Sequence, residues 1–223
     1  MFESRYSKTL TIILVIVIIA ILGLLGFLTY DYIHKYYSTK QASDFVDTYQ
    51  EDVTTGDGSG NYNDDENLTL DSNEIEISSS GSGTATKKKY KGYTVAGTMK
   101  IPAINLEYPI IEEVTTKALE TALIVLYPSG DNLNQPGNTV IIGHNYRNGT
   151  FFSNVKKLTN GAKIYVTDFR GVSITYQVYN IFEASSTDTS FYNRDTNGVA
   201  EITLSTCTDA SNDQRTIVFA KQI

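Results

Sequence analysis

The chain has 223 residues, with 18 Lys and Arg against 25 Asp and Glu, which gives a formal net charge of −7. This length allows one or two domains, and the lack of a basic patch argues against nucleic acid as a partner. A single cysteine excludes an intramolecular disulfide or a site with several cysteine ligands, and two histidines exclude a histidine-rich metal site, so we expect no cofactor.

The first part of the chain predicts a membrane anchor. Residues 10–32 open with a nearly unbroken apolar run, Leu10–Leu28, and end among aromatic residues of the kind found at a membrane interface. About 20 apolar residues span the hydrocarbon core of a bilayer. A cleaved signal peptide is the alternative, but its apolar core is shorter and ends at small residues. Residues 1–9 then lie in the cytoplasm, although basic residues on both sides of the run make the positive-inside preference weak.

A strongly acidic segment follows the anchor. From Gln41 to Thr86 the chain has eleven acidic residues and no Lys or Arg, whereas residues 87–223 have fourteen Lys and Arg against twelve Asp and Glu. The acidic segment is also rich in Asn, Ser, Gly and Thr. Such a composition cannot bury enough apolar surface to offset the entropy of ordering. We therefore expect residues 33–90 to be a disordered linker outside the cytoplasm.

Residues 91–223 predict one folded domain, in which short apolar segments alternate with turn signals. The expected strands lie near Val95–Ile101, Leu106–Ile111, Thr139–His144, Lys163–Thr167, Ser173–Glu183, Ala200–Thr206 and Thr216–Lys221. Short helices are expected at Thr116–Ile124 and Thr150–Leu158. Many evenly spaced strands with few helices indicate a mainly β fold, in the form of a closed or nearly closed β-barrel.

The only cysteine and a later arginine form the first part of a candidate site. Cys207 ends the predicted strand Ala200–Thr206, and Arg215 starts the next strand eight positions later. Side chains at the ends of paired strands can converge. A cation beside a thiol stabilises the thiolate, and a guanidinium can hold a developing oxyanion. A lone cysteine is equally often a small buried hydrophobic residue.

A histidine supplies the second part. The segment Thr139–His144, TVIIGH, predicts a buried strand that ends in His144. A histidine at a strand end is usually a hydrogen-bonded structural residue. Here, however, His144 is the only histidine of the folded part, and it ends an apolar strand just as Cys207 does. With Arg215, these residues provide the nucleophile, the acid/base and the oxyanion stabiliser that acyl transfer needs, and chain order does not matter for such a set.

The residues around these side chains resemble the sortase family of Gram-positive surface transpeptidases. TLSTC ends at Cys207 and is followed by an arginine eight positions later, and IIGH lies upstream. MKIPAINLEYPI (Met99–Ile110) resembles the N-terminal strands of sortases. The resemblance covers about residues 93–223, and its three parts together are highly specific.

Different features resemble different sortase classes. GHNYRNGTFFSNVKKL (Gly143–Leu158) and the seven residues between Cys207 and Arg215 are most similar to class B. The 16-residue loop 184–199 is short, as in class A or class D, where class B sortases have a long helical insert. Class B sortases also have extra N-terminal helices where this chain has its acidic segment. Because motif recognition is attributed to the loop before the cysteine strand, the motif preference stays open.

The resemblance implies an eight-stranded sortase barrel outside the cell, on a single-pass membrane protein with its N-terminus inside. It implies that Cys207 is the nucleophile, His144 the general acid/base, and Arg215 the residue that holds substrate and oxyanion. Thr206 matches a position that lines the substrate groove. The family cleaves a C-terminal sorting motif of the LPXTG or NPQTN type, forms a thioacyl-enzyme, and transfers the acyl group to an amine of cell-wall precursor or of another surface protein.

Some class A sortases bind calcium near the loop that precedes the cysteine strand. Four acidic residues are candidates for such a site here: Glu112, Glu113, Asp188 and Asp195. Scattered surface acids are the simpler interpretation, so no metal site is predicted.

Two other functions fit parts of the pattern. A papain-like cysteine hydrolase acting on cell-wall or surface peptides would use Cys207 and His144, but such enzymes place the cysteine at a helix N-terminus, and β-type residues precede it here. A non-enzymatic surface binding module would leave Cys207, His144 and Arg215 far apart.

Overall fold

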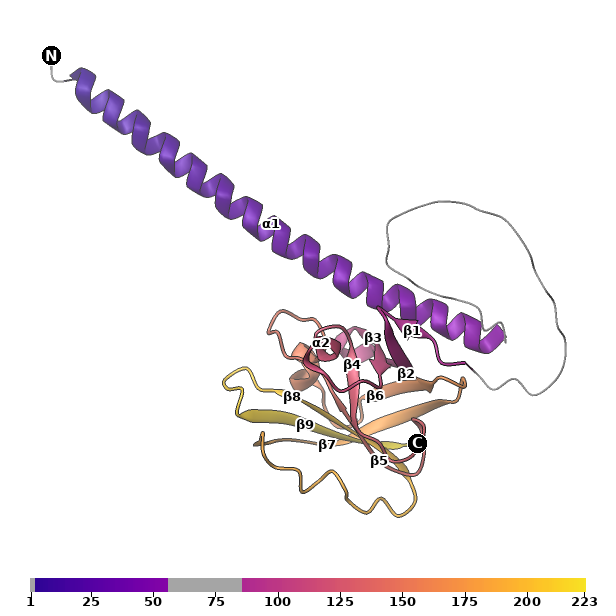
Figure 1. Ribbon diagram of the computed structural model, residues 1–223. Coiled ribbons are helices and arrows are strands. Elements are labelled where there is room, and N and C mark those ends of the chain that lie inside the picture. Colours follow the sequence, from indigo (N-terminus) through magenta and orange to yellow (C-terminus); the bar gives the residue numbers. More distant parts are fainter. Residues whose placement is uncertain (1–2, 56–85) are drawn as a thin grey trace, which may run out of the picture. The chain divides into compact units, whose positions relative to one another are not determined.

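The computed structural model of the chain describes residues 3–55 and 86–223, which fall into two units, Met1–Gln41 and Ala42–Ile223 (Figure 1). The first unit belongs to a long helix, α1 (Glu3–Thr55). The large apolar side chains of Leu10–Leu28 are exposed along this helix. In the part of the chain that the structure describes, α1 is the one helix long and apolar enough to cross a membrane, which fits the anchor expected at residues 10–32.

The structure corrects the predicted linker at its N-terminal end. Residues 33–55 were expected to be disordered, but α1 continues through them to Thr55. Four side chains of this part are almost fully buried: Ala42, Phe45, Val46 and Tyr49. Their spacing of three and four residues forms one stripe on a helix, and burial of that stripe offsets the ordering entropy. Of the rest of the predicted linker, residues 56–85 lie outside the described residues.

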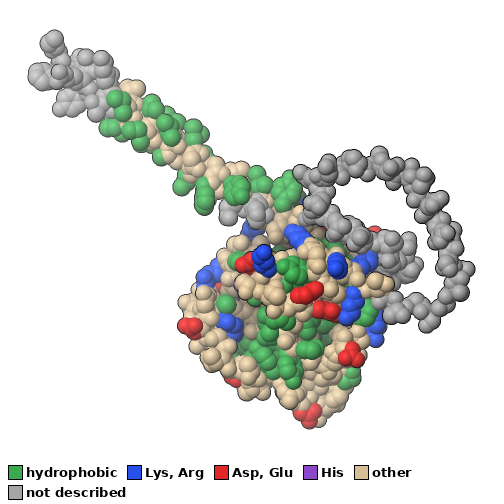
Figure 2. All heavy atoms as spheres, in the orientation of Figure 1, with side chains coloured by type: hydrophobic (Ala, Val, Ile, Leu, Met, Phe, Trp, Pro, Cys, Tyr) green, Lys and Arg blue, Asp and Glu red, His purple; other side chains and the backbone are tan. Residues whose placement is uncertain are grey.

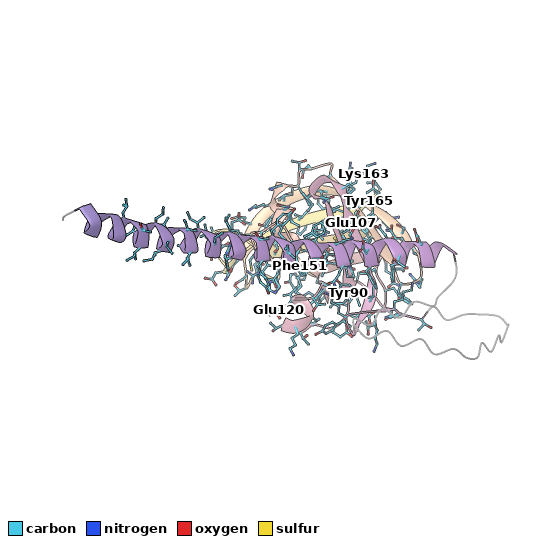
Figure 3. All side chains as sticks on the ribbon, turned by 90° about the horizontal axis from the view of Figure 1, so that it is seen from above. Tyr90, Glu107, Glu120, Phe151, Lys163 and Tyr165 are labelled. Carbon is cyan, nitrogen blue, oxygen red and sulfur yellow. The ribbon has the colours of Figure 1, made fainter. Side chains whose placement is uncertain are left out.

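Within the second unit, the buried stripe of α1 packs against the barrel. The ring of Phe45 lies 4.9 Å from that of Tyr90, and the hydroxyl of Ser43 donates a hydrogen bond of 2.7 Å to Glu107. Tyr90 and Glu107 lie on either side of α1 in Figure 3. The helix therefore covers one face of the barrel with contacts on both of its flanks.

The barrel is built from short strands and three short helices. The strands are β1 (Lys89–Tyr90), β2 (Tyr93–Ile101), β3 (Leu106–Ile111), β4 (Leu123–Tyr127), β5 (Gly137–Ile142), β6 (Lys163–Asp168), β7 (Ser173–Ser185), β8 (Ala200–Cys207) and β9 (Gln214–Gln222). The helices are η1 (Pro102–Ile104), α2 (Thr116–Leu119) and η2 (Phe152–Lys157), where η denotes a 3₁₀ helix.

Over the described residues, these strands form one sheet in the order β1-β2-β3-β4-β5-β8-β9-β7-β6, and a further pairing of β2 with β6 closes it. Because β1 adds only two residues at the end of this order, the closed barrel has eight strands, β2 to β9. The prediction of a mainly β, eight-stranded barrel with short helices is therefore confirmed.

The segment after β3 differs from its prediction. A helix was expected over Thr116–Ile124, but α2 makes only one turn and β4 starts at Leu123. The hydroxyl of Thr115 caps this turn by accepting a hydrogen bond from the amide of Ala118 at 3.1 Å. β4 then pairs in parallel with β3 and antiparallel with β5. The apolar residues whose spacing suggested a helix therefore belong in part to the sheet.

The core fixes which side chains of β8 and β9 face outward. Ile202 and Leu204 of β8 and Val218 and Ala220 of β9 are buried inside the barrel. Each fully buried Leu or Ile contributes roughly 1.5–3 kcal/mol to folding. Because side chains alternate along a strand, the odd-numbered residues of β8, including Cys207, point to the outer face.

The barrel surface mixes charges of both signs. On the face shown in Figure 2, Lys and Arg side chains lie among Asp and Glu side chains, and hydrophobic side chains gather between them. Some of these side chains form ion pairs, such as Lys87 with Glu112, whose Nζ and Oε1 atoms lie 2.5 Å apart.

Candidate active site

Cys207 and Arg215 lie side by side at one end of the sheet. Cys207 is the last residue of β8, Arg215 is the second residue of β9, and the two are directly paired in the antiparallel register. The Cα atoms of such a pair lie about 4.5–5.5 Å apart, and the side chains point to the same face. The Cys207 thiol is free and partly buried. This register brings together the thiol and the cation that a binding module would leave far apart.

The β8–β9 turn holds the Arg215 side chain. Its Nη1 donates hydrogen bonds to the backbone carbonyls of Asn212, at 2.5 Å, and Gln214, at 3.3 Å. The guanidinium is thus oriented by the backbone of the turn that joins the two strands. A cation fixed in this way costs little reorganisation when negative charge develops beside it.

His144 reaches the same place from a third strand. β5 runs parallel to β8, with Ile142 paired to Ser205. The amide of Gly143 then donates to the carbonyl of Ser205 at 3.3 Å. Two residues further along each chain come His144 and Cys207, so the register sets them beside one another.

Close packing requires glycine before the histidine. A Cβ on Gly143 would lie 2.7 Å from Cδ2 of Leu123 and 2.9 Å from Cδ2 of Phe152, distances that real side chains do not show. The small residue therefore lets the backbone that carries His144 lie against the core.

The surroundings of His144 favour its neutral form. Burial lowers the pKa of the imidazole from its ordinary value of 6.5, and the negative charge of Glu120 acts in the opposite direction. The ring packs on Tyr146, with centroids 4.7 Å apart. Its Nε2 is buried without a hydrogen-bond partner among the described residues.

The loop after His144 is tied to the cysteine by residues that the sequence analysis did not single out. The side-chain amide of Asn145 donates to the carbonyl of Cys207 at 2.8 Å and to Asp209 at 2.9 Å. The Asn145 side-chain oxygen accepts the amide of Arg147 at 2.9 Å, and Arg147 donates to the carbonyl of Thr208 at 3.3 Å. The only signal in the sequence was the polar stretch NYRNG, which is also an ordinary loop composition.

Thr206 lies on the opposite face of β8 from Cys207. Its side chain is 3% exposed, and its hydroxyl donates to the carbonyl of Gly143 at 2.7 Å. This bond joins the cysteine strand to the chain segment that carries His144. The expected part of Thr206 in lining a substrate groove stays a prediction.

Each of the four acidic residues considered for calcium is engaged locally. Their partners are Lys87 for Glu112, the amide of Thr94 for Glu113, the amide of Ser190 for Asp188 and the amide of Asn197 for Asp195. Among residues 3–55 and 86–223, no group of three or more His, Cys, Asp or Glu side chains is placed to hold a metal ion.

A pocket lies away from the three candidate residues. A pocket of about 390 Å³ lies between β2, β4 and the loop 128–133, with Phe169 and Lys87 at its rim. Neither Cys207 nor Arg215 lines it. Cys207 and Arg215 lie instead at the ends of β8 and β9.

Comparison with known proteins identifies the family. The family model described as a Sortase domain matches residues 99–223, more than half of the chain. Among curated proteins, Sortase A of Bacillus anthracis is 29% identical over 127 residues. That match covers 56% of this chain and 58% of the relative, so the chain spans little more than half of that protein's length.

Solved structures share the fold. Sortase A from Corynebacterium diphtheriae has a TM-score of 0.53 and 32% identity, over 59% of this chain and 61% of that one. A sortase D5 transpeptidase from Clostridium perfringens has a TM-score of 0.51 and 27% identity, over 58% of this chain and 79% of that one. Neither structure bears on the class B resemblance of residues 143–158, which stays a prediction.

Proposed function

Because the chain belongs to the sortase family, we propose that it is a membrane-anchored cysteine transpeptidase that cleaves a C-terminal sorting motif and transfers the acyl group to an amine. The motif is of the LPXTG or NPQTN type. The clients are surface proteins that bear it, and the acceptor is an amine of cell-wall precursor or of another surface protein.

One observation carries this proposal. Cys207 and Arg215 form an antiparallel pair, and β5 pairs in parallel with β8. The ends of β5 and β8 and the start of β9 therefore lie at the same end of the barrel. This placement supports the proposal, because acyl transfer needs a nucleophile, an acid/base and an oxyanion stabiliser near one another.

In the first half-reaction, neutral His144 takes the proton from the Cys207 thiol, and Sγ attacks the carbonyl carbon of the scissile peptide bond. The oxygen of that carbonyl takes up negative charge, which the Arg215 guanidinium stabilises. The C–N bond then breaks, and the leaving amine receives a proton from His144. The product is a thioester between Cys207 and the client protein.

In the second half-reaction, an acceptor amine attacks the thioester carbonyl. His144 removes the proton from this amine, and the C–S bond breaks to release the Cys207 thiolate. The new amide keeps the number of peptide-type bonds unchanged. One difficult amide exchange is thereby divided into two easier steps.

The N-terminal helix supplies the proposed location. Residues 10–32 of α1 cross the cell membrane once, with residues 1–9 inside and the catalytic domain outside. The exposed apolar side chains of Leu10–Leu28 support this, because only lipid would cover them favourably. An acceptor attached to the outer membrane surface would then be within reach of the enzyme.

The proposal is tested on the full chain in detergent, with fluorogenic peptides that carry LPXTG-like and NPQTN-like motifs, with and without an added amine. We expect an acyl-enzyme adduct by intact mass that disappears in Cys207→Ala, and a product whose formation depends on the amine. Cleavage that ignores the amine would instead establish a hydrolase. The position of Cys207 at a strand end, and not at a helix N-terminus, favours the transpeptidase.

A further inference from the structure

The loop between β7 and β8, residues 186–199, is packed onto the same outer face as the catalytic candidates. Along β9, Arg215, Ile217 and Phe219 share this face. Phe191 of the loop is buried against it, with its ring 5.8 Å from Phe219 and 5.9 Å from Phe182. The loop is therefore part of the surface that runs along β9 to Arg215.

The next residue of the loop borders the catalytic end of this face. Burial raises the pKa of the Tyr192 phenol, and the nearby cation of Arg215 partly offsets that rise. The ring of Tyr192 also lies 6.0 Å from that of Tyr127, at the end of β4. Tyr127 pairs with Val140 of β5, so the Tyr192 ring packs beside the sheet on the face that Phe191 covers.

A single side chain of the loop, Arg194, makes three of the hydrogen bonds that join the loop to the barrel. Nε and Nη2 of Arg194 donate to one oxygen of Glu201 at 3.1 and 2.6 Å, and Nη1 donates to the hydroxyl of Thr203 at 2.6 Å. The guanidinium carbon lies 4.0 Å from the ring centre of Phe219. The two ion-paired side chains are only 16% and 11% exposed, so solvent screens their attraction weakly.

These contacts continue to the loop backbone. The hydroxyl of Thr203 donates to Oδ1 of Asn138 at 2.8 Å. Nδ2 of Asn138 donates to the carbonyls of Phe191, at 3.3 Å, and Tyr192, at 3.0 Å. Arg194 itself reaches the carbonyl of Phe191 at 3.3 Å. The backbone of the two aromatic residues is therefore fixed from both sides.

We propose that Arg194 is a positioning residue for substrate recognition, which holds the loop 186–199, with Phe191 and Tyr192, in its binding conformation before the sorting peptide arrives. This inference rests on the proposed function, because it assigns the peptide to that face. Preorganisation of this kind lowers the entropy lost on binding and appears in KM more than in the chemical step.

The kinetic test compares Arg194→Met with a matched control, Arg170→Met, in the full chain in detergent. Arg170 forms a comparable two-bond ion pair with buried Asp168, at 2.9 and 2.7 Å, on the turn at the other end of β7. We expect Arg194→Met to raise KM for the sorting peptide roughly tenfold, as loss of a charge-assisted hydrogen bond would. The kcat should stay near the wild-type value, and Arg170→Met should leave KM unchanged. Arg194→Lys keeps the charge but loses the forked guanidinium, so its KM should lie between the KM of the wild type and that of Arg194→Met.

A second measurement needs no substrate. Amide hydrogen exchange over residues 186–199 should speed up in Arg194→Met and not in Arg170→Met, while the rate of Cys207 alkylation by iodoacetamide stays unchanged. Unchanged exchange would overturn the inference, and so would faster exchange with an unchanged KM. If the wild-type enzyme turns over no sorting peptide, the proposed function fails, whereas faster exchange confined to this loop would still establish the part of Arg194 in holding it.

Discussion

The side-chain amide of Asn145 donates a hydrogen bond of 2.8 Å to the backbone carbonyl of Cys207. Asn145 directly follows the proposed acid/base, His144, and Cys207 is the proposed nucleophile. The hydrogen bond therefore links the two parts of the site, which lie 62 positions apart in the sequence. The relative placement of the imidazole and the thiol therefore depends on a neutral side chain that takes no part in the chemistry.

Replacing Asn145 with Ala should lower kcat/KM for the sorting peptide by roughly tenfold, because the Cys207 carbonyl loses a partner worth about 1–1.5 kcal/mol. Steady-state kinetics on the full chain would measure this. Asn148→Ala is the matched control, since Asn148 bonds only within its own loop, to Thr150 at 3.0 Å and 2.7 Å. Equal losses in the two variants would mean that general loop stability, and not the bond to Cys207, sets the rate.

Replacing Arg215 with Ala should slow acyl-enzyme formation by about 3–4 kcal/mol in the barrier, the usual cost of losing one oxyanion donor. Single-turnover measurement with a sorting peptide isolates this step. Thermal unfolding should change little, because the hydrogen bonds of this half-buried side chain run only to the adjoining turn. Near-wild-type acylation would remove Arg215 from the mechanism.

Gly143→Ala should destabilise the barrel by about 1–3 kcal/mol, because the added methyl must displace Leu123 and Phe152. It should also lower kcat, since the backbone shift moves the neighbouring His144. Urea unfolding and steady-state kinetics would measure the two effects. A stable variant with unchanged kcat would show that the packing before the histidine is looser than its contacts indicate.

The depressed pKa of His144 predicts a pH dependence of stability with a definite sign. At and below pH 6.5 the unfolded chain binds a proton at this residue more readily than the folded chain does. The wild-type protein should therefore lose stability below about pH 6.5 relative to His144→Asn, which lacks this protonation. Urea unfolding of both proteins at pH 7.5 and pH 5 would measure it, and a parallel response would contradict the lowered pKa.

The buried stripe of α1 predicts that residues of the acidic segment stabilise the barrel. Phe45→Ala should lower the free energy of unfolding by about 3 kcal/mol, at the low end for a buried phenylalanine because the site is an interface. Asp44→Ala, one residue earlier and exposed, is the control. Thermal unfolding of the full chain would compare them, and equal midpoints would mean that this part of the helix does not dock.

The sequence predicted a candidate site because its three residues end or begin apolar strands. Cys207, Arg215 and His144 could be placed at strand ends from alternation alone, and the register of β5, β8 and β9 then brings those ends together. Asn145 was missed because an asparagine in a polar loop carries no periodic signal. Its importance arises only from a contact with a distant strand.

Two elements escaped sequence reasoning for a different physical reason. The stripe of four buried residues in the last part of α1 lies among acidic residues, so average composition hid its helical spacing. Three residues separate α2 from β4, and the start of β4 was included in the predicted helix. Short apolar runs fit the periodicity of a helix and that of a strand equally well. Tertiary packing determined the structure of both segments, and a short stretch of sequence does not show which distant residues will pack against it.

The parallel pairing of β5 with β8 joins segments that lie more than 60 residues apart in the chain. Contacts of such sequence separation form late, because the chain must first close a long loop. A newly made molecule therefore has its thiol long before it has the imidazole beside it. Until β5 pairs with β8, the proposed acid/base does not stand at the same end of the barrel as the cysteine, so a partly folded molecule lacks the complete set of proposed catalytic residues.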